Sequence, residues 1–348
     1  MRGALCTVAL VACGGSATTS TAITTSIPAT SSTTVTTSDP PITLAPPVTQ
    51  ADDALPEVQS IGGMGGVVAI DATPFPDWVT IAGDSAWVAN VDDGVARYDL
   101  TTGTLIGTVS TGTNICLAMD TALNSLWVGD CASTTLIRVN VESGTVDATI
   151  ALPFTSITEE SSVAAGEDGV FVLGDRGTTI ARIDPVANTV TSTFDAPPSA
   201  SALRSGEGGL WVTSAATETL SRVDPSSGAI VAAIRVGAGA GFLAIGEGSV
   251  WVMNSADRTV SRVDPATNSV VASIVVSDGP ISGGDMAVGG GHAWARVSDA
   301  LVAKIDPSTN AVVARYGLPS GSGSVAADDN AVWISAHDVT KVWRVPID

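Results

Sequence analysis

Residues 248–272 read GSVWVMNSADRTVSRVDPATNSVVA, and this stretch decides the fold. Three short runs rich in valine contain Trp251, Arg262 and Ala272, and a polar loop and the turn DPATN separate these runs. In the turn, proline presets φ, aspartate caps the backbone and asparagine accepts the left-handed conformation. A further apolar run, residues 241–245, precedes the stretch. Short β-branched runs bounded by turn residues predict strands, so this unit contains four of them.

The same phrase recurs along the chain at intervals near forty residues. An aromatic residue marks each copy, with successive spacings of 40, 44, 40, 40, 43 and 39: Trp87, Trp127, Phe171, Trp211, Trp251, Trp294 and Trp333. A cation follows the aromatic residue in every copy: Arg97, Arg138, Arg182, Arg222, Arg262, Lys304 and Arg344. Repeats of about 40 residues with four strands each are typical of β-propellers. We therefore predict an all-β fold, a seven-bladed β-propeller over residues 57–348.

The repeated aromatic and basic residues have structural roles in our interpretation. One aromatic side chain at the same place in every blade fills the space between neighbouring sheets, although a stacking platform for sugars or bases is the alternative. The repeated arginine, and the aspartate two positions after it, are expected to pair or to cap turns at the blade edges.

The ends of the repeat region predict how the ring closes. The seventh repeat has only three predicted strands, residues 324–327, 332–336 and 341–347. A spare strand, GVVAIDATP, lies at residues 66–74, before the first repeat. We expect this N-terminal strand to pair with the last blade, because an open ring would leave two sheet edges unpaired.

The N-terminal sequence predicts the cellular location of the protein. Residues 1–12, MRGALCTVALVA, have the short apolar run of a signal peptide. The sequence LVACG at residues 10–14 resembles the lipobox of bacterial lipoproteins, which implies a lipid on Cys13; an ordinary signal peptide is the alternative. Residues 16–50 contain 18 Ser and Thr and 5 Pro. We expect residues 13–56 to form a lipidated, disordered tether, and the protein to lie on the extracellular face of a bacterial cell membrane.

Composition excludes several classes of function. Acidic residues outnumber Lys and Arg 35 to 15, which gives a formal net charge of −20, so we expect no nucleic-acid partner. No uninterrupted apolar run reaches 18 residues, so the membrane contact we expect is the lipid anchor alone. Two histidines are too few for a multi-histidine metal site.

Two of the four cysteines flank a predicted hairpin. Residues 115–120 and 125–130 form its strands, and antiparallel register places Cys116 opposite Cys131. In an exported protein this pair predicts a disulfide. A free pair or a thiolate metal site stays open, and Cys6 leaves with the signal peptide.

Acidic residues from several blades predict a ligand site. In propellers the loops that lead into the innermost strand and those between the second and third strands share one rim. The candidates that we place on this rim are Asp77, Asp130, Asp175, Asp257, Asp285 and Asp338, with His337 as a weak acid–base candidate. Carboxylates suit Ca²⁺, Mg²⁺ or a cationic ligand near the channel mouth, whereas solvated loops are the alternative. We expect no required cofactor, with Ca²⁺ or Mg²⁺ possible.

Residues 248–272 resemble the YVTN/YncE-type repeat propellers, and they are similar to the streptogramin B (virginiamycin B) lyase superfamily. The second resemblance implies a lyase that uses His, Glu and Mg²⁺ near the channel, with histidines where the innermost strands begin. Those starts read DW, NI, SV, SA, GF, DM and GS here, at residues 77, 114, 162, 201, 241, 285 and 323, and none is histidine.

Three functions follow from these observations. The first is a surface-tethered, non-enzymatic binding or scaffold propeller, monomeric, whose unknown partner is a cell-envelope ligand or protein. The second is a lyase of the streptogramin B type. The third, a quinone-dependent dehydrogenase, is remote, because such propellers have eight tryptophan-docked blades or a longer chain.

Overall fold

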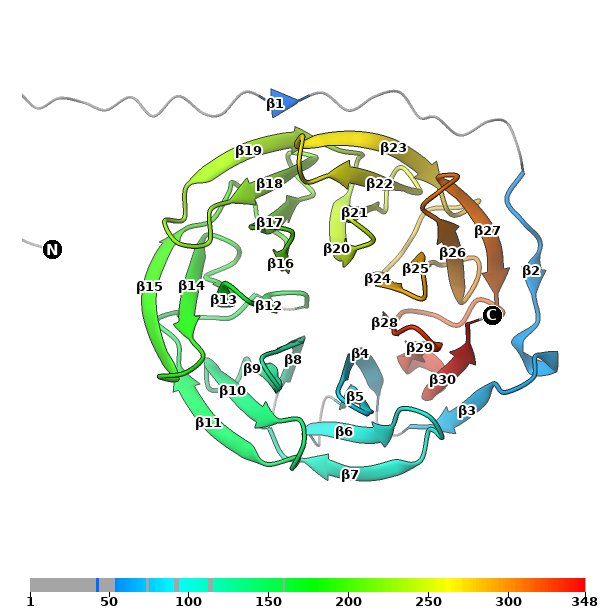
Figure 1. Ribbon diagram of the computed structural model, residues 1–348, viewed down its shortest axis with the longest axis horizontal. Coiled ribbons are helices and arrows are strands. Elements are labelled where there is room, and N and C mark those ends of the chain that lie inside the picture. The colour runs from blue at the N-terminus through cyan, green and yellow to red at the C-terminus, as the bar shows by residue number, and fades with distance from the viewer. Residues whose placement is uncertain are drawn as a thin grey trace, which may run out of the picture. The chain divides into compact units, whose positions relative to one another are not determined.

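The computed structural model describes residues 42–43, 54–72, 75–90, 94–111, 115–158 and 160–347. The predicted signal peptide, Cys13 and most of the predicted tether lie outside the described residues. The compact unit Pro40–Asp348 contains seven sheets arranged around a common axis, as Figure 1 shows. The predicted fold class, a seven-bladed β-propeller, is confirmed. Among the described residues, no helix has the length and apolar character that crossing a membrane requires.

Each of the first six blades contains four consecutive antiparallel strands. Blade 1 comprises β4 (Pro76–Ala82), β5 (Ser85–Asn90), β6 (Gly94–Asp99) and β7 (Leu105–Val109). Blade 2 comprises β8 (Ile115–Ala122), β9 (Ser125–Asp130), β10 (Thr135–Asn140) and β11 (Val146–Ala151). Blade 3 comprises β12 (Val163–Gly166), β13 (Gly169–Gly174), β14 (Thr179–Asp184) and β15 (Thr189–Asp195). Blade 4 comprises β16 (Ala202–Gly206), β17 (Gly209–Ser214), β18 (Thr219–Val223) and β19 (Ile230–Arg235). Blade 5 comprises β20 (Ala240–Gly246), β21 (Ser249–Asn254), β22 (Thr259–Asp264) and β23 (Ser269–Val275). Blade 6 comprises β24 (Asp285–Gly289), β25 (His292–Arg296), β26 (Val302–Asp306) and β27 (Ala311–Tyr316).

Blade 7 combines strands from both ends of the chain. Its three C-terminal strands are β28 (Val325–Ala327), β29 (Ala331–Ala336) and β30 (Lys341–Pro346). The fourth is β3 (Val68–Asp71), which pairs antiparallel with β30 from Val68 opposite Arg344 to Asp71 opposite Lys341. The predicted closure by an N-terminal strand is therefore confirmed, and an ion pair between Lys341 and Asp71 joins the two strands.

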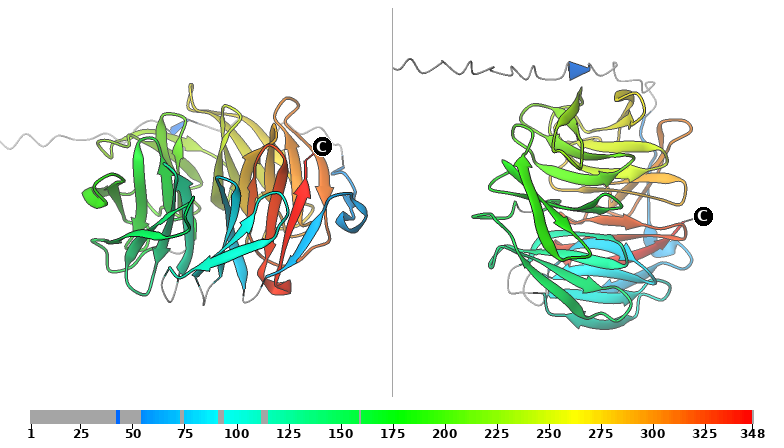
Figure 2. Two further views of the ribbon diagram at one scale, coloured as in Figure 1. Left: turned by 60° about the horizontal axis from the view of Figure 1, so that its bottom comes forward. Right: turned by 60° about the vertical axis from the view of Figure 1, so that its left-hand side comes forward.

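Two short strands add to outer edges that the repeat pattern did not predict to be paired. The strand β2 (Val58–Gln59) runs parallel to β27, and β1 (Ile42–Thr43) runs parallel to β19. Two 3₁₀ turns complete the described elements, η1 (Ile61–Gly63) and η2 (His337–Val339). Figure 2 shows the blades from two further directions.

The aromatic markers pack between neighbouring blades, as predicted. All seven are 0–1% exposed. A marker cation lies over the ring in five blades, with Arg or Lys 5.1–5.5 Å from the ring centroid. Each aromatic side chain thus fills the core, and five of the seven also have a cation on their face.

The marker arginines join neighbouring blades through a turn. Arg222 of blade 4 donates hydrogen bonds to the carbonyl oxygen of Pro265 (2.9 Å) and to Oδ1 of Asn268 (3.2 Å), both in the last turn of blade 5. Hydrogen bonds to the next blade around the ring are also donated by four other marker arginines: Arg97, Arg138, Arg262 and Arg344. The predicted capping of turns is correct for these five arginines, and the turn that each of them caps belongs to the neighbouring blade, whereas Arg182 donates to the carbonyl oxygen of Asp168 in its own blade.

In five blades an aspartate lies two positions after the marker cation and caps its own turn, whereas blade 2 has Asn140 in this role and blade 7 has Pro346 at this position. In blade 4, Oδ1 of Asp224 accepts backbone N–H bonds from Ser226 (3.0 Å) and Ser227 (2.8 Å). Hydrogen bonds of this kind stabilise the ionised form and hold the pKa of Asp224 below its usual range. The turn then needs a left-handed residue, which is Gly228 here, with φ of 74°.

The predicted disulfide between Cys116 and Cys131 is present, with the Cα atoms 5.3 Å apart. The ladder between β8 and β9 differs from the predicted one. It passes from Met119 opposite Val128 to Ile115 opposite Asp130, so a bulge of the inner strand lies at the cystine. The extra residues of the bulge increase the local twist and bend the strand at the rim of blade 2.

Candidate functional site

The first strands of the seven blades face one another around the axis and enclose a cavity. The innermost strands contact their neighbours in sequence from β4 round to β28, and β28 returns to β4. The cavity has a volume of about 310 Å³, and all seven of these strands contribute residues to its lining. Such a volume lies at the lower end of the range for small-molecule pockets, so the cavity is large enough for a small ligand.

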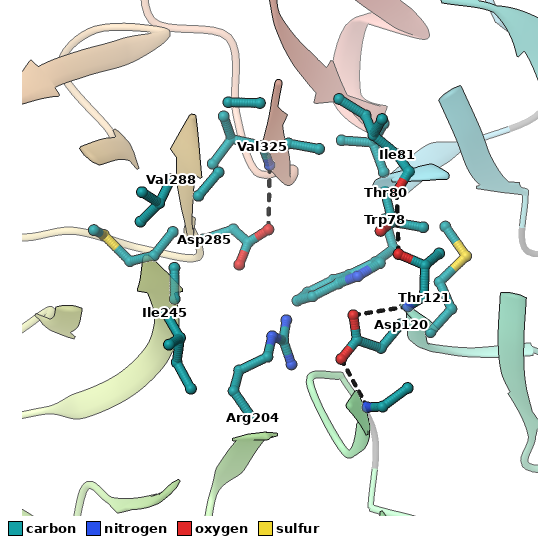
Figure 3. Close-up of a pocket in the computed structure, with 18 of the residues that line it drawn as sticks. Trp78, Thr80, Ile81, Asp120, Thr121, Arg204, Ile245, Asp285, Val288 and Val325 are labelled. Carbon is teal, nitrogen blue, oxygen red and sulfur yellow. Dashed lines mark hydrogen bonds between the residues drawn. The ribbon is translucent and has the colours of Figure 1, made fainter. Parts of the chain in front are cut away.

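Most of the lining is small or apolar, and three charged side chains stand out. They are Asp120 from β8, Arg204 from β16 and Asp285 from β24. Figure 3 shows Asp285 and Asp120 on different sides of the cavity, with the guanidinium of Arg204 reaching between them. The site therefore combines one cation with two carboxyl groups.

Asp285 was a predicted ligand residue, and its side chain lines the cavity. Its Oδ2 accepts hydrogen bonds from Ser324 Oγ (2.7 Å) and from the backbone N–H of Val325 (3.2 Å). Its Oδ1 is buried and has no hydrogen-bond partner among the described residues. Loss of water on burial raises the pKa of Asp285 to about 6, although Arg204 and these hydrogen bonds oppose the shift. One oxygen is therefore held in place by two donors, while the other is buried and receives no donor from the described residues.

Asp120 differs from Asp285 because both of its oxygens have partners. Its Oδ1 accepts the backbone N–H of Thr121 (2.8 Å), and its Oδ2 accepts the N–H of Ala165 (2.9 Å) from the next blade. Burial raises the pKa of Asp120, and Arg204 acts against that shift. Asp120 therefore joins blades 2 and 3 and adds negative potential to the cavity.

Arg204 lies over the indole of Trp78, with its guanidinium carbon 5.7 Å from the ring centroid. The indole in turn packs against Phe242, at a centroid distance of 6.0 Å. Within the described part of the chain, the guanidinium donates one hydrogen bond, to the carbonyl oxygen of Leu203 (2.9 Å), and forms no direct ion pair. A cation–π contact thus holds a guanidinium that is close to two carboxyl groups without binding either directly.

The repeat register explains where Asp120 and Arg204 stand. Each pairs with the aromatic marker of its blade, Asp120 with Trp127 and Arg204 with Trp211. The residues opposite the markers of the other five blades are small and uncharged: Thr80, Ala164, Ala244, Ala287 and Ala326. Our sequence analysis did not single out Asp120 or Arg204. The detectable signal was a charge seven residues before the aromatic marker, where the other blades have alanine or threonine.

Three other predicted site residues gather on the rim, outside the lining of the cavity. Nδ1 of His337 lies 2.8 Å from Oδ1 of Asp338, in η2. Burial raises the pKa of Asp77 in β4, the nearby Asp338 adds to the rise, and Arg296 opposes it. The buried Arg296 donates to the carbonyl oxygen of Gly321 (2.8 Å), and loss of water lowers its pKa to about 10. Through this bond Arg296 holds the loop that precedes blade 7.

The remaining predicted acids cap loops. Asp130 accepts the N–H of Ala132 (3.0 Å), Asp175 accepts that of Thr155 (2.8 Å), and Asp257 accepts that of Ala238 (2.6 Å). These three acids do not line the cavity, and ligand binding by them stays a prediction. Among the described residues, no group of three or more His, Cys, Asp or Glu side chains could hold a metal ion. Ca²⁺ or Mg²⁺ binding stays a prediction.

Neither histidine lies in an innermost strand. His292 begins β25, the second strand of blade 6, and its Nδ1 lies 2.7 Å from the carbonyl oxygen of Gly290. His337 begins η2. The imidazoles are therefore absent from the described lining of the cavity.

Comparison with known proteins supports the fold. The sequence matches no protein-family model, and a search of the curated proteins finds no significant match. The structure is similar to virginiamycin B lyase from Staphylococcus aureus, with a TM-score of 0.69 and 15% identity over 81% of this chain and 99% of that one. A streptogramin B lyase structure gives a TM-score of 0.68 and 13% identity over 81% and 98%. The structure of U3-55K gives 0.65 and 9% over 81% and 98%. At these identities the likeness concerns the fold.

Proposed function

We propose that this protein is a non-enzymatic binding propeller whose central cavity receives a small cationic ligand through Asp285. The observation that carries the proposal is the buried Oδ1 of Asp285, which has no partner among the described residues. A buried carboxylate oxygen without a hydrogen bond costs free energy that a cationic donor would recover. Two carboxyl groups face one guanidinium in the cavity, so its potential favours a cation.

A thermal-shift panel tests this function. The panel contains ethylammonium, ethylguanidinium, a polyamine, Ca²⁺ and Mg²⁺, and it is run on the wild type, Asp285→Asn and Asp257→Asn. Asp257 is the matched control, since it caps a loop and does not line the cavity. A true ligand at a hundredfold excess over its Kd stabilises the fold by about 2.7 kcal/mol. We expect an organic cation to stabilise the wild type and Asp257→Asn, but not Asp285→Asn. Equal responses from all three proteins, or no response from any, would refute a channel site at Asp285.

A lyase of the streptogramin B type is the second candidate, because the two lyase structures share this fold. The cavity presents no histidine among its described lining residues, which favours binding over lyase chemistry. Incubation with a streptogramin B antibiotic, followed by mass spectrometry, separates the two. We expect the ring of the antibiotic to stay closed, and its linearisation would replace the binding proposal with the lyase.

The proposed location is the outer face of the cell membrane, through a lipid on Cys13. The lipobox-like sequence at residues 10–14 supports it. Metabolic labelling with a fatty-acid probe should mark the wild type but not Cys13→Ser. Equal labelling would leave a protein without this anchor.

A further inference from the structure

We propose that Trp78, Asp120 and Asp285 form a cage for a guanidinium group, that Arg204 occupies this cage in the free protein, and that a small guanidinium-bearing ligand displaces it. This inference rests on the proposed function and specifies both the ligand class and the step that admits the ligand. Figure 3 shows the three cage residues around the end of the Arg204 side chain.

The aromatic wall of the cage is already shaped for a planar cation. Trp78 is 3% exposed, and Phe242 packs against it at 6.0 Å. The guanidinium carbon of Arg204 lies 5.7 Å from the indole centroid, within the range of a cation–π contact. A planar guanidinium can lie over an aromatic ring while its edge donates to an oxygen acceptor, which a compact ammonium does less well.

Arg204 is held more weakly than the other arginines that lie over tryptophan. Arg262 donates to Ser249 Oγ (2.9 Å) and to Asn310 Oδ1 (2.9 Å), besides the carbonyl oxygen of Pro307. For Arg204 the described part of the chain offers one acceptor, the carbonyl oxygen of its own neighbour Leu203. A half-buried side chain with one local hydrogen bond can rotate away at little cost, whereas Arg262 would have to break a bridge between blades.

Arg204 also leaves the cage incomplete. Oδ1 of Asp285 stays without a partner although the guanidinium is near enough to oppose the rise in the pKa of that carboxyl. The side chain of Arg204 is attached to the backbone of β16. A free guanidinium has no such tether, so it can lie over Trp78 and donate to Oδ1 of Asp285 in a charge-assisted hydrogen bond. The ligand therefore gains a contact that the resident side chain does not make.

Titration calorimetry with ethylguanidinium tests the displacement. The proteins are the wild type, Arg204→Ala, Arg204→Gln, Asp285→Asn and the control Arg222→Ala, which removes an arginine that lies over Trp211 and does not line the cavity. Because Arg204 competes for the cage, its removal should lower the Kd about tenfold or more. Asp285→Asn should raise the Kd by a similar factor, and Arg222→Ala should leave it unchanged. Arg204→Gln keeps a polar side chain and should act like Arg204→Ala if the alanine variant folds poorly.

The outcomes separate this inference from the proposed function. Weaker binding after removal of Arg204 would show that this side chain contributes to the ligand site, and would overturn displacement while the cation site stands. Binding to the Arg204 variants with none to the wild type would make Arg204 a permanent structural occupant, which also overturns it. Ethylammonium binding as tight as ethylguanidinium binding would refute the guanidinium class alone. If no cation binds any of these proteins, both proposals fail.

Discussion

Asp285 exchanges water for one hydroxyl group and one backbone amide when the chain folds. The exchange is incomplete, because Oδ1 receives no donor. The charged form is therefore less stable in the folded protein than in water, which is the physical origin of its raised pKa. A residue that costs stability and faces a cavity is typical of a site that serves a ligand.

The sign of the resulting pH dependence can be worked out. Folding raises the pKa of Asp285 from its ordinary value of 3.8 to about 6. Between these values the folded protein binds more protons than the unfolded chain, so this group makes stability fall as pH rises from about 4 to about 6. We predict that the stability of Asp285→Asn relative to the wild type increases by about 2 kcal/mol between pH 4 and pH 7. Urea titrations of both proteins across this range measure it. A constant difference would mean that the carboxyl is not desolvated.

A marker arginine that bridges two blades should contribute measurably to the free energy of unfolding. Arg262→Ala removes a cation over Trp251 at 5.1 Å and the hydrogen bonds to blade 6. We predict a loss of about 2 kcal/mol in the free energy of unfolding. Arg176→Ala, at an exposed position of a loop, is the control and should change stability by less than about 0.5 kcal/mol. Equal, small effects of the two substitutions would contradict the bridging role.

Residues at repeat positions were predictable, and residues that depart from the repeat were not. The aromatic and basic markers recur at fixed spacing, so their burial and turn capping follow from the pattern. Asp120 and Arg204 occupy a position where other blades have alanine or threonine, and a search for what repeats passes over them. The rim acids looked equivalent in sequence, because a hydrogen bond from a loop amide to Asp175 or Asp257 leaves no trace in composition.

At the scale of elements, the hairpin β8–β9 has a covalent staple at its bulge. The cystine joins residues 15 positions apart. In the chain-entropy account a loop of this length is worth about 3 kcal/mol. We predict that the double variant Cys116→Ser/Cys131→Ser loses stability by about this amount, and that dithiothreitol brings the wild type down to the same midpoint while leaving the variant unchanged. A reductant-sensitive double variant would point to a different thiol.

The strand β3 closes the ring, and a designed cross-link can test its register. Asp71 and Lys341 are opposite each other in the antiparallel pair and form an ion pair. We predict that Asp71→Cys/Lys341→Cys forms a disulfide on mild oxidation, which peptide mass spectrometry detects. The link spans 270 positions, so it should stabilise the fold by about 5 kcal/mol. Asp71→Cys alone should form no such link. Free thiols in the oxidised double variant would mean that β3 does not pair with β30 as described.

Most elements were predictable because each strand is a short β-branched run between turn residues. The pairing at Cys116 was not predictable, because a bulge changes which residues are opposite each other without changing the sequence pattern by which a strand is recognised. The parallel strands β1 and β2 were also missed. Each has two residues, and its pairing depends on a free outer edge of β19 or β27, which is a property of the assembled sheet.

At the scale of the whole molecule, closure of the seven blades creates the cavity. Every innermost strand contributes to one lining, so residues from blades 2, 4 and 6 meet although 84 and 81 positions separate Asp120 from Arg204 and Arg204 from Asp285. The repeat predicts this ring, and the ring fixes where departures from the repeat come together. The candidate site follows from those departures: two carboxyl groups, one guanidinium and one indole within a channel whose other lining residues are small or apolar (Figure 3).

A crystal structure of the wild type soaked to saturation with ethylguanidinium tests this account most directly. We predict planar density over the indole of Trp78, with a nitrogen at hydrogen-bond distance from Oδ1 of Asp285 and the side chain of Arg204 turned away from the cage. Arg204 in its present position over Trp78, with only water beside Asp285, would contradict the account.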